Sequence, residues 1–145
     1  MIALLQRVSS ASVSVDDEII GQIGRGLLVL TAVHRDDQDK DIARLGERIL
    51  GYRVFPDDAG RMNRSVSDIG GELLLVPQFT LAADTRKGTR ASFTRAADPE
   101  KGEEFFGRLV ANCRESLETV ETGRFGANMQ VSLINDGPVT FWLES

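Results

Sequence analysis

Hydrophobic and polar residues alternate near the start of the chain in a way that predicts β-strands. Residues 2–15 contain the alternating run SSASVSV, residues 16–17 are two aspartates suited to a turn, and residues 18–23 continue as a second extended segment. Residues 26–33 are almost all apolar, which is typical of a strand covered on both faces. The pattern therefore predicts a hairpin followed by a buried strand.

The period of the apolar residues then changes to that of a helix in two places. The first helix is predicted over roughly residues 38–51, with Asp36 or Asp37 as its cap. The second begins at Asp98-Pro99, a cap followed by proline in the preferred order. The apolar faces of the two helices are Ile42, Leu45, Ile49 and Leu50, and Phe106, Leu109, Val110, Cys113 and Leu117. On such a face, Cys113 is interpreted as a small core residue and not as a nucleophile.

The remaining segments are read as strands, with a central one over residues 72–81 and two final ones over residues 129–134 and 139–143. With strands in the majority and two helices to cover one face, we expect one mixed α/β domain over residues 1–145. Its predicted architecture has three layers, with two packed β-sheets and the helices on one face.

Two stretches contain unusual backbone signals. In LLLVPQFTL, Pro77 interrupts an apolar strand, so Gln78, Phe79 and Thr80 are expected where the strand opens out. There an amide, an aromatic ring and a hydroxyl can touch a ligand together. In NDGPVT, a hairpin turn with a stiff exit is one interpretation. The other is a backbone wedge of fixed shape at Gly137-Pro138, since X-Pro is the common site of cis peptides.

Composition and motifs exclude several classes of function. The net charge of −5 argues against non-specific coating of nucleic acid, and the single cysteine excludes an internal disulfide and a cysteine-rich metal site. The apolar runs are too short to span a bilayer, and with no signal peptide at the start we expect a cytoplasmic protein. His34 is the only histidine and ends an apolar strand, so it is interpreted as a surface residue. Arg86, Lys87 and Arg90 form a small cationic cluster that is either a solvated loop or a local contact for nucleic acid.

Taken together, QFTL and NDGPVT resemble the motifs of the D-aminoacyl-tRNA deacylase family. The resemblance continues through QRVSSASVSVD, YRVFPDDAGRMNRSV and GRFGANMQVSLINDGPVTFWLES, and so covers the whole chain. It implies a homodimeric hydrolase that cleaves the ester between a D-amino acid and the 3′-terminal adenosine of tRNA. If L-amino acids are rejected by steric clash, glycine has no side chain to clash, so we expect glycyl-tRNA to be cleaved as well. The resemblance implies no metal or organic cofactor, and neither a membrane nor DNA is expected as a partner.

The resemblance also implies a role for each motif. Gln78, Phe79 and Thr80 are the expected catalytic segment beside the adenosine and the ester. A cis Gly137-Pro138 peptide, delivered across the dimer into a shared active site, is the expected filter that rejects L-amino acids. Arg86, Lys87 and Arg90 are the expected tRNA contacts. This sequence has Pro77 where the family commonly has serine, and Ala91 where it commonly has proline, so any role of that serine hydroxyl is lost.

Two questions stay open from the sequence. The attacking group is either water assisted by the ribose 2′-hydroxyl or the Thr80 hydroxyl, although no histidine or lysine neighbour is evident to activate Thr80. The alternative function is a non-catalytic module that binds the acceptor end of RNA.

Overall fold

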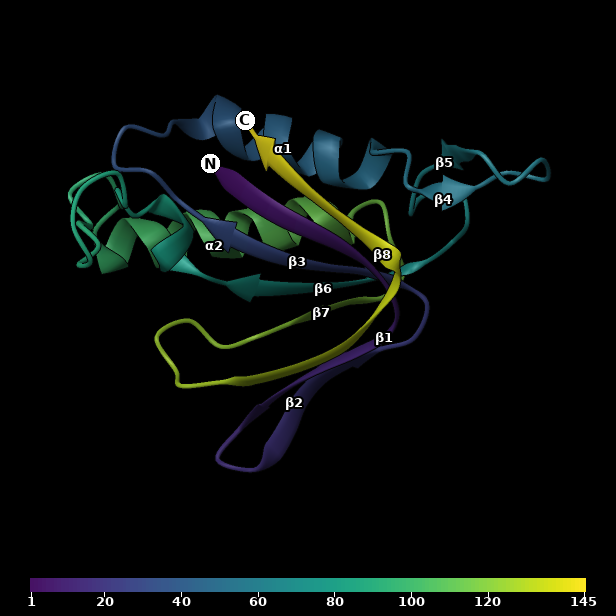
Figure 1. Ribbon diagram of the computed structural model, residues 1–145, viewed down its shortest axis with the longest axis horizontal. Helices are drawn as coiled ribbons and strands as arrows, with labels where there is room; N and C mark the ends of the chain where they lie inside the picture. The colour runs from purple at the N-terminus through teal and green to yellow at the C-terminus, as the bar shows by residue number, and fades with distance from the viewer.

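The structure, a computed structural model, describes residues 1–145 as a succession of strands with two helices inserted (Figure 1). The strands are β1 (Ile2–Val15), β2 (Glu18–Ile23), β3 (Gly26–Ala32), β4 (Phe55–Pro56), β5 (Met62–Arg64), β6 (Glu72–Pro77), β7 (Val120–Thr122) and β8 (Gln130–Glu144). The helices are α1 (Asp39–Gly51) and α2 (Pro99–Arg114), and a 3-10 turn, η1 (Phe79–Ala82), follows β6. None of the helices is long and apolar enough to cross a membrane.

The main sheet is organised around β1, which is long enough to pair with three strands. Its order is β2-β1-β3-β6-β7, and β8 pairs with β1 as well. The first half of β1 lies between β3 and β8, and the second half lies between β2 and β8. The mixed α/β class is confirmed. The two packed sheets of the prediction are corrected to one six-stranded sheet that curls nearly into a barrel, with β4 and β5 as a separate small pair (Figure 1).

The curl brings β2 close to β6 and β7 on the far side of the sheet. A Cβ atom on Gly21 in β2 would lie 3.0 Å from the carbonyl oxygen of Thr122 and 3.3 Å from a methyl carbon of Leu74. Only a glycine fits such an approach without displacing a neighbour. The interior of the curl holds a small apolar cluster of Val8, Ala11, Val13, Ile23, Leu28, Leu74 and Val76.

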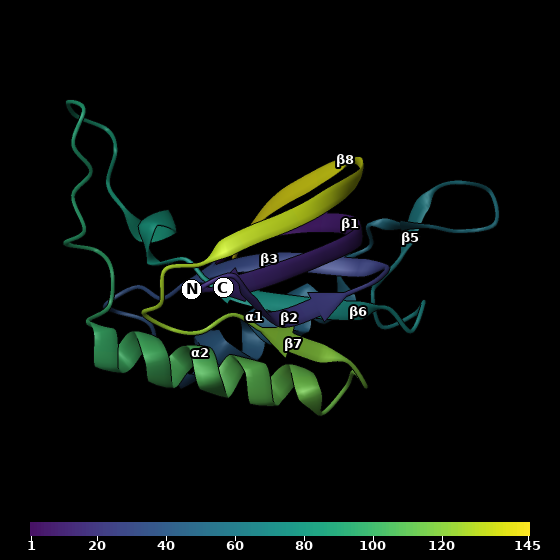
Figure 2. The ribbon, with the colours of Figure 1, turned by 90° about the horizontal axis from the view of Figure 1, so that it is seen from below.

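A larger core lies between the sheet and the two helices, which cover the same face (Figure 2). The predicted apolar faces are confirmed, because Ile42, Leu45 and Ile49 of α1 and Leu109 of α2 are all buried. Cys113 belongs to this core, and burial raises the pKa of its thiol to about 12. A thiol with so high a pKa stays protonated near neutral pH and is a poor nucleophile. The interpretation of Cys113 as a core residue is therefore confirmed.

The helix caps differ in how well local sequence predicted them. At α2, the Asp98 carboxylate accepts a hydrogen bond from the Lys101 N–H at 2.9 Å, with Pro99 as the first residue, as predicted. At α1 the predicted aspartate caps are wrong, because Gln38 is the N-cap and its N–H donates to Asp41 at 2.8 Å. Asp37 instead accepts from the buried N-terminal ammonium group, at 2.7 Å. Asp37, which the local pattern predicted as a cap, therefore forms a long-range ion pair instead.

Candidate functional site

Residues 78–80 lie where β6 leaves the sheet. The strand ends at Pro77, so the predicted continuation to Leu81 is wrong, while the predicted opening at the proline is confirmed. Pro77 has no N–H with which to continue the ladder. The N–H of Gln78 still donates to the Thr31 carbonyl of β3 at 2.7 Å, and the chain then turns into η1. The end of the segment is therefore anchored to the sheet, although its side chains lie outside it.

The three side chains offer different groups to solvent. The Phe79 ring is 57% exposed, Thr80 is also exposed, and the Gln78 amide donates a hydrogen bond to the Thr80 hydroxyl. No imidazole, amine or carboxylate hydrogen-bonds to that hydroxyl. Because Phe79 and Thr80 begin a helical turn, their backbone N–H groups have no partner within it. The segment can therefore donate hydrogen bonds to a carbonyl or oxyanion, but it has no evident base to activate Thr80.

Residues 135–140 do not form a hairpin turn. The segment lies inside β8, and both halves of that strand pair with β1. Val8 pairs with Asn135 and Gln6 with Thr140, so residues 136–139 bulge out opposite Arg7. The prediction of two strands joined by a turn is therefore wrong. The Gly137-Pro138 peptide is cis, as the resemblance implied.

Arg7 holds one side of this bulge. Its Nε donates to the carbonyl oxygen of Asp136 at 2.8 Å, and its Nη1 donates to the carbonyl oxygen of Val54 at 2.7 Å. The guanidinium therefore ties the bulge to the chain just after α1. Sequence reasoning missed this residue, although an arginine among the apolar residues of a buried strand was an available signal.

Asn135 and the backbone conformation of Gly137 hold the other side of the bulge. The side-chain Oδ1 of Asn135 accepts a hydrogen bond from the Val139 backbone N–H at 2.7 Å, and its side-chain Nδ2 donates to the Thr140 hydroxyl at 2.9 Å. Gly137 has φ of +149°, and a Cβ atom there would lie 2.6 Å from a Val139 methyl carbon. Any residue other than glycine would have to displace that neighbour. The bulge is therefore a backbone feature fixed on both sides.

Within one chain, the bulge and residues 78–80 are far apart. The bulge lies opposite Arg7, next to the pairs Val8–Gly26 and Gly26–Glu72, whereas Pro77 pairs with Thr31 at the other end of β6. The five residue-to-residue steps from Glu72 to Pro77 correspond to roughly 17 Å. Figures 1 and 2 show the sharp bend of β8 and the teal turn that follows β6 at opposite ends of the sheet. One chain alone does not bring the two predicted parts of the site together.

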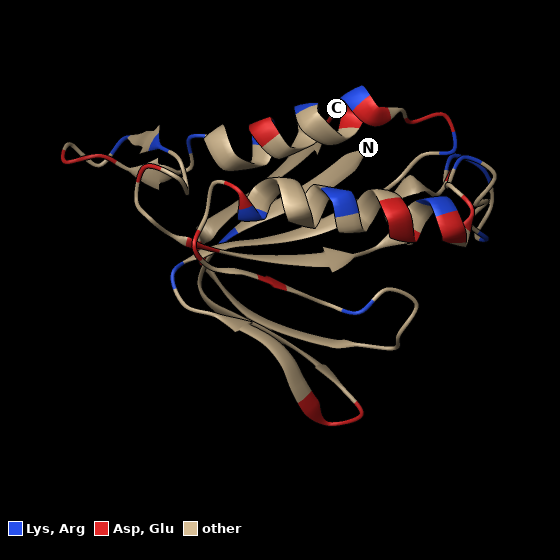
Figure 3. Ribbon diagram, turned by 180° about the vertical axis from the view of Figure 1, so that it is seen from behind, with Lys and Arg blue, Asp and Glu red and all other residues tan.

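The predicted cationic cluster lies in the loop between η1 and α2, at the end of the molecule opposite β4 and β5 (Figure 3). Arg86 is already engaged, since its Nε donates to the Asp84 carboxylate at 2.9 Å. The Arg86 guanidinium holds the pKa of Asp84 far below its usual range, so the carboxylate stays ionised beside it. Lys87 and Arg90 are exposed and form no ion pair. Within the predicted cluster, these two cations are left available for an anionic partner.

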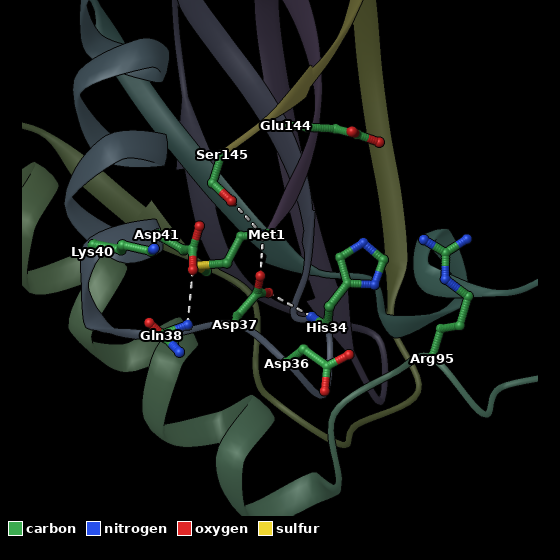
Figure 4. Close-up of a pocket in the computed structure, with 10 residues that line it drawn as sticks. All are labelled: Met1, His34, Asp36, Asp37, Gln38, Lys40, Asp41, Arg95, Glu144 and Ser145. Atoms are coloured by element: carbon green, nitrogen blue, oxygen red, sulfur yellow. Dashed lines mark hydrogen bonds and ion pairs between the residues drawn. The ribbon is translucent and has the colours of Figure 1, made fainter.

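A separate polar cleft of about 480 Å³ lies at the end of β3 and the start of α1 (Figure 4). Its lining residues are Met1, His34, Asp36, Asp37, Gln38, Lys40, Asp41, Arg95, Glu144 and Ser145. The Asp37 carboxylate accepts hydrogen bonds from both the N-terminal ammonium and the backbone N–H of His34, so its charge is already used in contacts within the fold. No group of three or more His, Cys, Asp or Glu side chains is placed to hold a metal ion. We place the candidate site at residues 78–80, where unpaired donors and an exposed ring gather.

Comparison with known proteins agrees with the motifs. The family model described as D-Tyr-tRNA(Tyr) deacylase matches residues 4–144. The chain is 68% identical to a D-aminoacyl-tRNA deacylase of Alkalilimnicola ehrlichii, over 100% of this chain and 97% of that protein. It is 62% identical to the enzyme of that name from Stenotrophomonas maltophilia strain K279a, over 99% of each chain.

Two solved structures are also similar. The c-Myc DNA Unwinding Element Binding Protein superposes with a TM-score of 0.96 at 41% identity, covering 100% of this chain and 99% of that one. A probable eukaryotic D-amino acid tRNA deacylase superposes with a TM-score of 0.88 at 18% identity, over 99% and 98% of the chains, and shows the shared fold. With a family model that spans nearly all its residues and relatives of such high identity, the chain belongs to the D-Tyr-tRNA(Tyr) deacylase family.

Proposed function

We propose that this protein is a D-aminoacyl-tRNA deacylase that hydrolyses the ester between a D-amino acid, or glycine, and the 3′-terminal adenosine of tRNA. Water is the second substrate, and the products are free tRNA and the amino acid. The observation that carries the proposal is the match of residues 4–144 to the family, with QFTL and the bulge of NDGPVT both intact. The backbone N–H groups of Phe79 and Thr80 can donate hydrogen bonds to the carbonyl oxygen of the ester.

The complete active site is proposed to need two copies of the chain. Gly137-Pro138 lies too far from residues 78–80 of its own chain to act there. A symmetric dimer can bring the bulge of each subunit to the catalytic segment of the other. Ile134 and Trp142 are 61% and 49% exposed on β8, on either side of the bulge, and large exposed apolar residues on one strand are typical of a protein interface.

The bulge is proposed to act as a steric filter. L- and D-aminoacyl esters carry the same chemical groups, so hydrogen bonds alone distinguish them poorly. A rigid wall can instead exclude the L side chain by clash. The contacts of Arg7 and Asn135 support such rigidity, since they hold the backbone on both sides of Gly137-Pro138.

For the chemical step, we favour attack by water that is assisted by the ribose 2′-hydroxyl of the substrate. The N–H groups of Phe79 and Thr80 stabilise the oxyanion, and losing one such donor typically costs about 100- to 1,000-fold in rate. Attack by Thr80 itself is the second candidate. The absence of a base beside its hydroxyl argues against it, because a serine or threonine hydroxyl is a weak nucleophile without one.

Replacing Thr80 distinguishes these two mechanisms. With Thr80→Ala, the Gln78 amide loses its hydroxyl partner, and we expect single-turnover deacylation of D-tyrosyl-tRNA to slow by about 3- to 10-fold, as for the loss of one hydrogen bond. Thr80→Ser keeps the hydroxyl and serves as the control. Complete loss of activity in Thr80→Ala, with an acyl-enzyme trapped on wild-type Thr80, would refute water attack.

The cationic loop predicts a salt effect. Removing Lys87 and Arg90 by alanine substitution should raise KM for tRNA with little change in kcat. It should also reduce the slope of log affinity against log salt by roughly 0.7–0.9 for each lost phosphate contact. Arg86→Ala should have a smaller effect, since Arg86 already pairs with Asp84. Arg61→Ala, which removes one exposed cation near β5, is the charge-matched control for each single substitution. An unchanged slope in the Lys87 and Arg90 variant would mean that the loop is merely solvated.

The alternative of a non-catalytic module that binds RNA ends is tested by turnover. We expect one enzyme molecule to release many molecules of D-tyrosine from D-tyrosyl-tRNA. Stoichiometric protection of the ester, without release, would support the binding module instead.

A further inference from the structure

An exposed aromatic pair lies beside the candidate site. The rings of Phe79 and Phe93 have centroids 5.1 Å apart and are tilted by 54°. Phe79 is 57% exposed and Phe93 is 44% exposed, so neither ring is buried by the fold. Because the rings are tilted, they do not cover each other face to face, and ring surface remains free for a ligand.

Phe93 is held in place and does not belong to the free tip of its loop. Just before it, Asp84 and Ser92 exchange two backbone hydrogen bonds, at 2.8 and 3.0 Å. Just after it, the Phe93 carbonyl accepts from the Ala96 N–H at 3.1 Å. The ring is therefore presented to solvent from a fixed backbone.

The surroundings of the pair are cationic. Lys87, Arg90 and Arg95 are exposed in the same loop, and none of them forms an ion pair. An apolar protein partner would leave these charges unmatched. Aromatic rings beside cations that follow a phosphate backbone are instead typical of sites for single-stranded nucleic acid, where unpaired bases stack on the rings.

We propose that Phe93, next to Phe79, stacks on the unpaired base that precedes the terminal adenosine of the substrate. This inference rests on the proposed function, in which residues 78–80 hold the adenosine and the ester. The ring separation of 5.1 Å suits a neighbouring nucleotide, because stacked nucleotides lie roughly 3.4 Å apart and extended ones further. Phe93 would thereby give the enzyme affinity for a single-stranded end of any sequence.

The test compares two D-tyrosyl esters, one on full-length tRNA and one on adenosine alone. For Phe93→Ala, the ratio of kcat/KM on tRNA to kcat/KM on adenosine should fall by roughly 5- to 150-fold, the range expected for losing one base–aromatic stack. The loss on tRNA should lie in KM. Phe93→Trp should keep the ratio near that of wild type, whereas Phe93→Leu should lower it, because leucine is apolar without an aromatic face. Met62→Ala is the matched control, since Met62 is 45% exposed and lies on β5.

Several results would overturn the inference. An unchanged ratio of kcat/KM on the two esters, whether from equal losses on both or from no loss on either, would exclude stacking on a preceding base. A Phe93→Leu variant that behaves like wild type would exclude it as well. A Phe93→Ala protein that becomes monomeric by light scattering would show that the ring contacts a second copy of the chain. If circular dichroism shows that Phe93→Ala is misfolded, the test depends on whether Phe93→Trp keeps the ratio and Phe93→Leu lowers it. A wild-type protein that hydrolyses neither ester would instead refute the proposed function.

Discussion

Two variants that are each nearly inactive should regain activity when their subunits are mixed. The first is Phe79→Pro, which removes a backbone donor at the start of η1, a position where proline is tolerated in helical turns. The second is Gly137→Ala, whose Cβ atom would lie 2.6 Å from a Val139 methyl carbon and distort the bulge. We expect each homodimer to lose about 100-fold or more of the deacylation rate. The first variant lacks an oxyanion donor, and in the second the displaced backbone of the bulge is expected to block the partner's pocket instead of forming its wall.

Recovery follows from the separation of the two segments within one chain. In a mixed dimer, one site combines the intact residues 78–80 of the Gly137→Ala chain with the intact bulge of the Phe79→Pro chain. Random mixing makes half of the dimers mixed, each with one intact site, so activity should return to about a quarter of wild type. The measurement is the initial rate on D-tyrosyl-tRNA after the mixture has been partly unfolded and refolded.

A chain that carries both changes provides the control. In a mixture with an equal amount of wild type, both sites of every mixed dimer should be inactive, because each contains one altered segment. About a quarter of the activity should remain, since only wild-type dimers stay intact. If each site belonged to a single chain, this mixture would keep half of the activity, and the two single variants would not rescue each other. Absence of rescue in a mixture that mass spectrometry shows to contain mixed dimers would contradict the shared site.

The parts of the fold that sequence predicted well are those set by local contacts. The face of α1 follows from Ile42, Leu45 and Ile49 at helical spacing, and the start of α2 follows from Asp98 and Pro99 alone. The end of β6 at Pro77 is likewise a local effect of a missing donor. The cap of α1 was predicted wrongly because Asp37 contacts Met1, a residue that no local pattern places beside it.

The bulge in β8 illustrates the same limit for strands. NDGPVT between two alternating runs has the local pattern of a hairpin, and pattern alone does not say which strand pairs with each run. Both runs pair with β1, whose length allows it to hold them in line. Arg7 then fills the space opposite the bulge. The motif was recognisable in sequence, but the geometry that gives it a shape depends on contacts more than a hundred residues away.

The same reasoning applies to the candidate site. Residues 78–80 were identified because Pro77 marks the point where a strand opens, and the structure agrees. Their relation to Gly137-Pro138 was not derivable from spacing along the chain, since the fold separates the two segments. Phe93 was not predicted either, because its proximity to Phe79 depends on how the loop folds back.

The second prediction with a large expected effect concerns which aminoacyl-tRNA esters the enzyme does not hydrolyse. If a rigid wall at Gly137-Pro138 excludes L side chains, glycyl-tRNA has nothing to clash and should be cleaved together with D-tyrosyl-tRNA. L-alanyl-tRNA should be spared, because one methyl group forced into a rigid pocket costs about 1–3 kcal/mol, which corresponds to roughly 5- to 150-fold in rate. Single-turnover rates on the three esters measure this directly.

Loosening the wall at Gly137-Pro138 should reduce the difference in rate between glycyl-tRNA and L-alanyl-tRNA. Asn135→Ala removes the acceptor of the Val139 N–H and the donor to Thr140, so we expect the ratio of glycyl to L-alanyl rates to fall by about 10-fold, the equivalent of one or two hydrogen bonds. Ser132→Ala, an exposed position of the same strand before the bulge, should leave that ratio as in wild type. Recognition by attraction to a D side chain makes the opposite prediction, since glycine lacks the group that would be bound. Full resistance of glycyl-tRNA, at enzyme concentrations that clear D-tyrosyl-tRNA, would therefore exclude a steric wall and require a pocket that binds the D side chain.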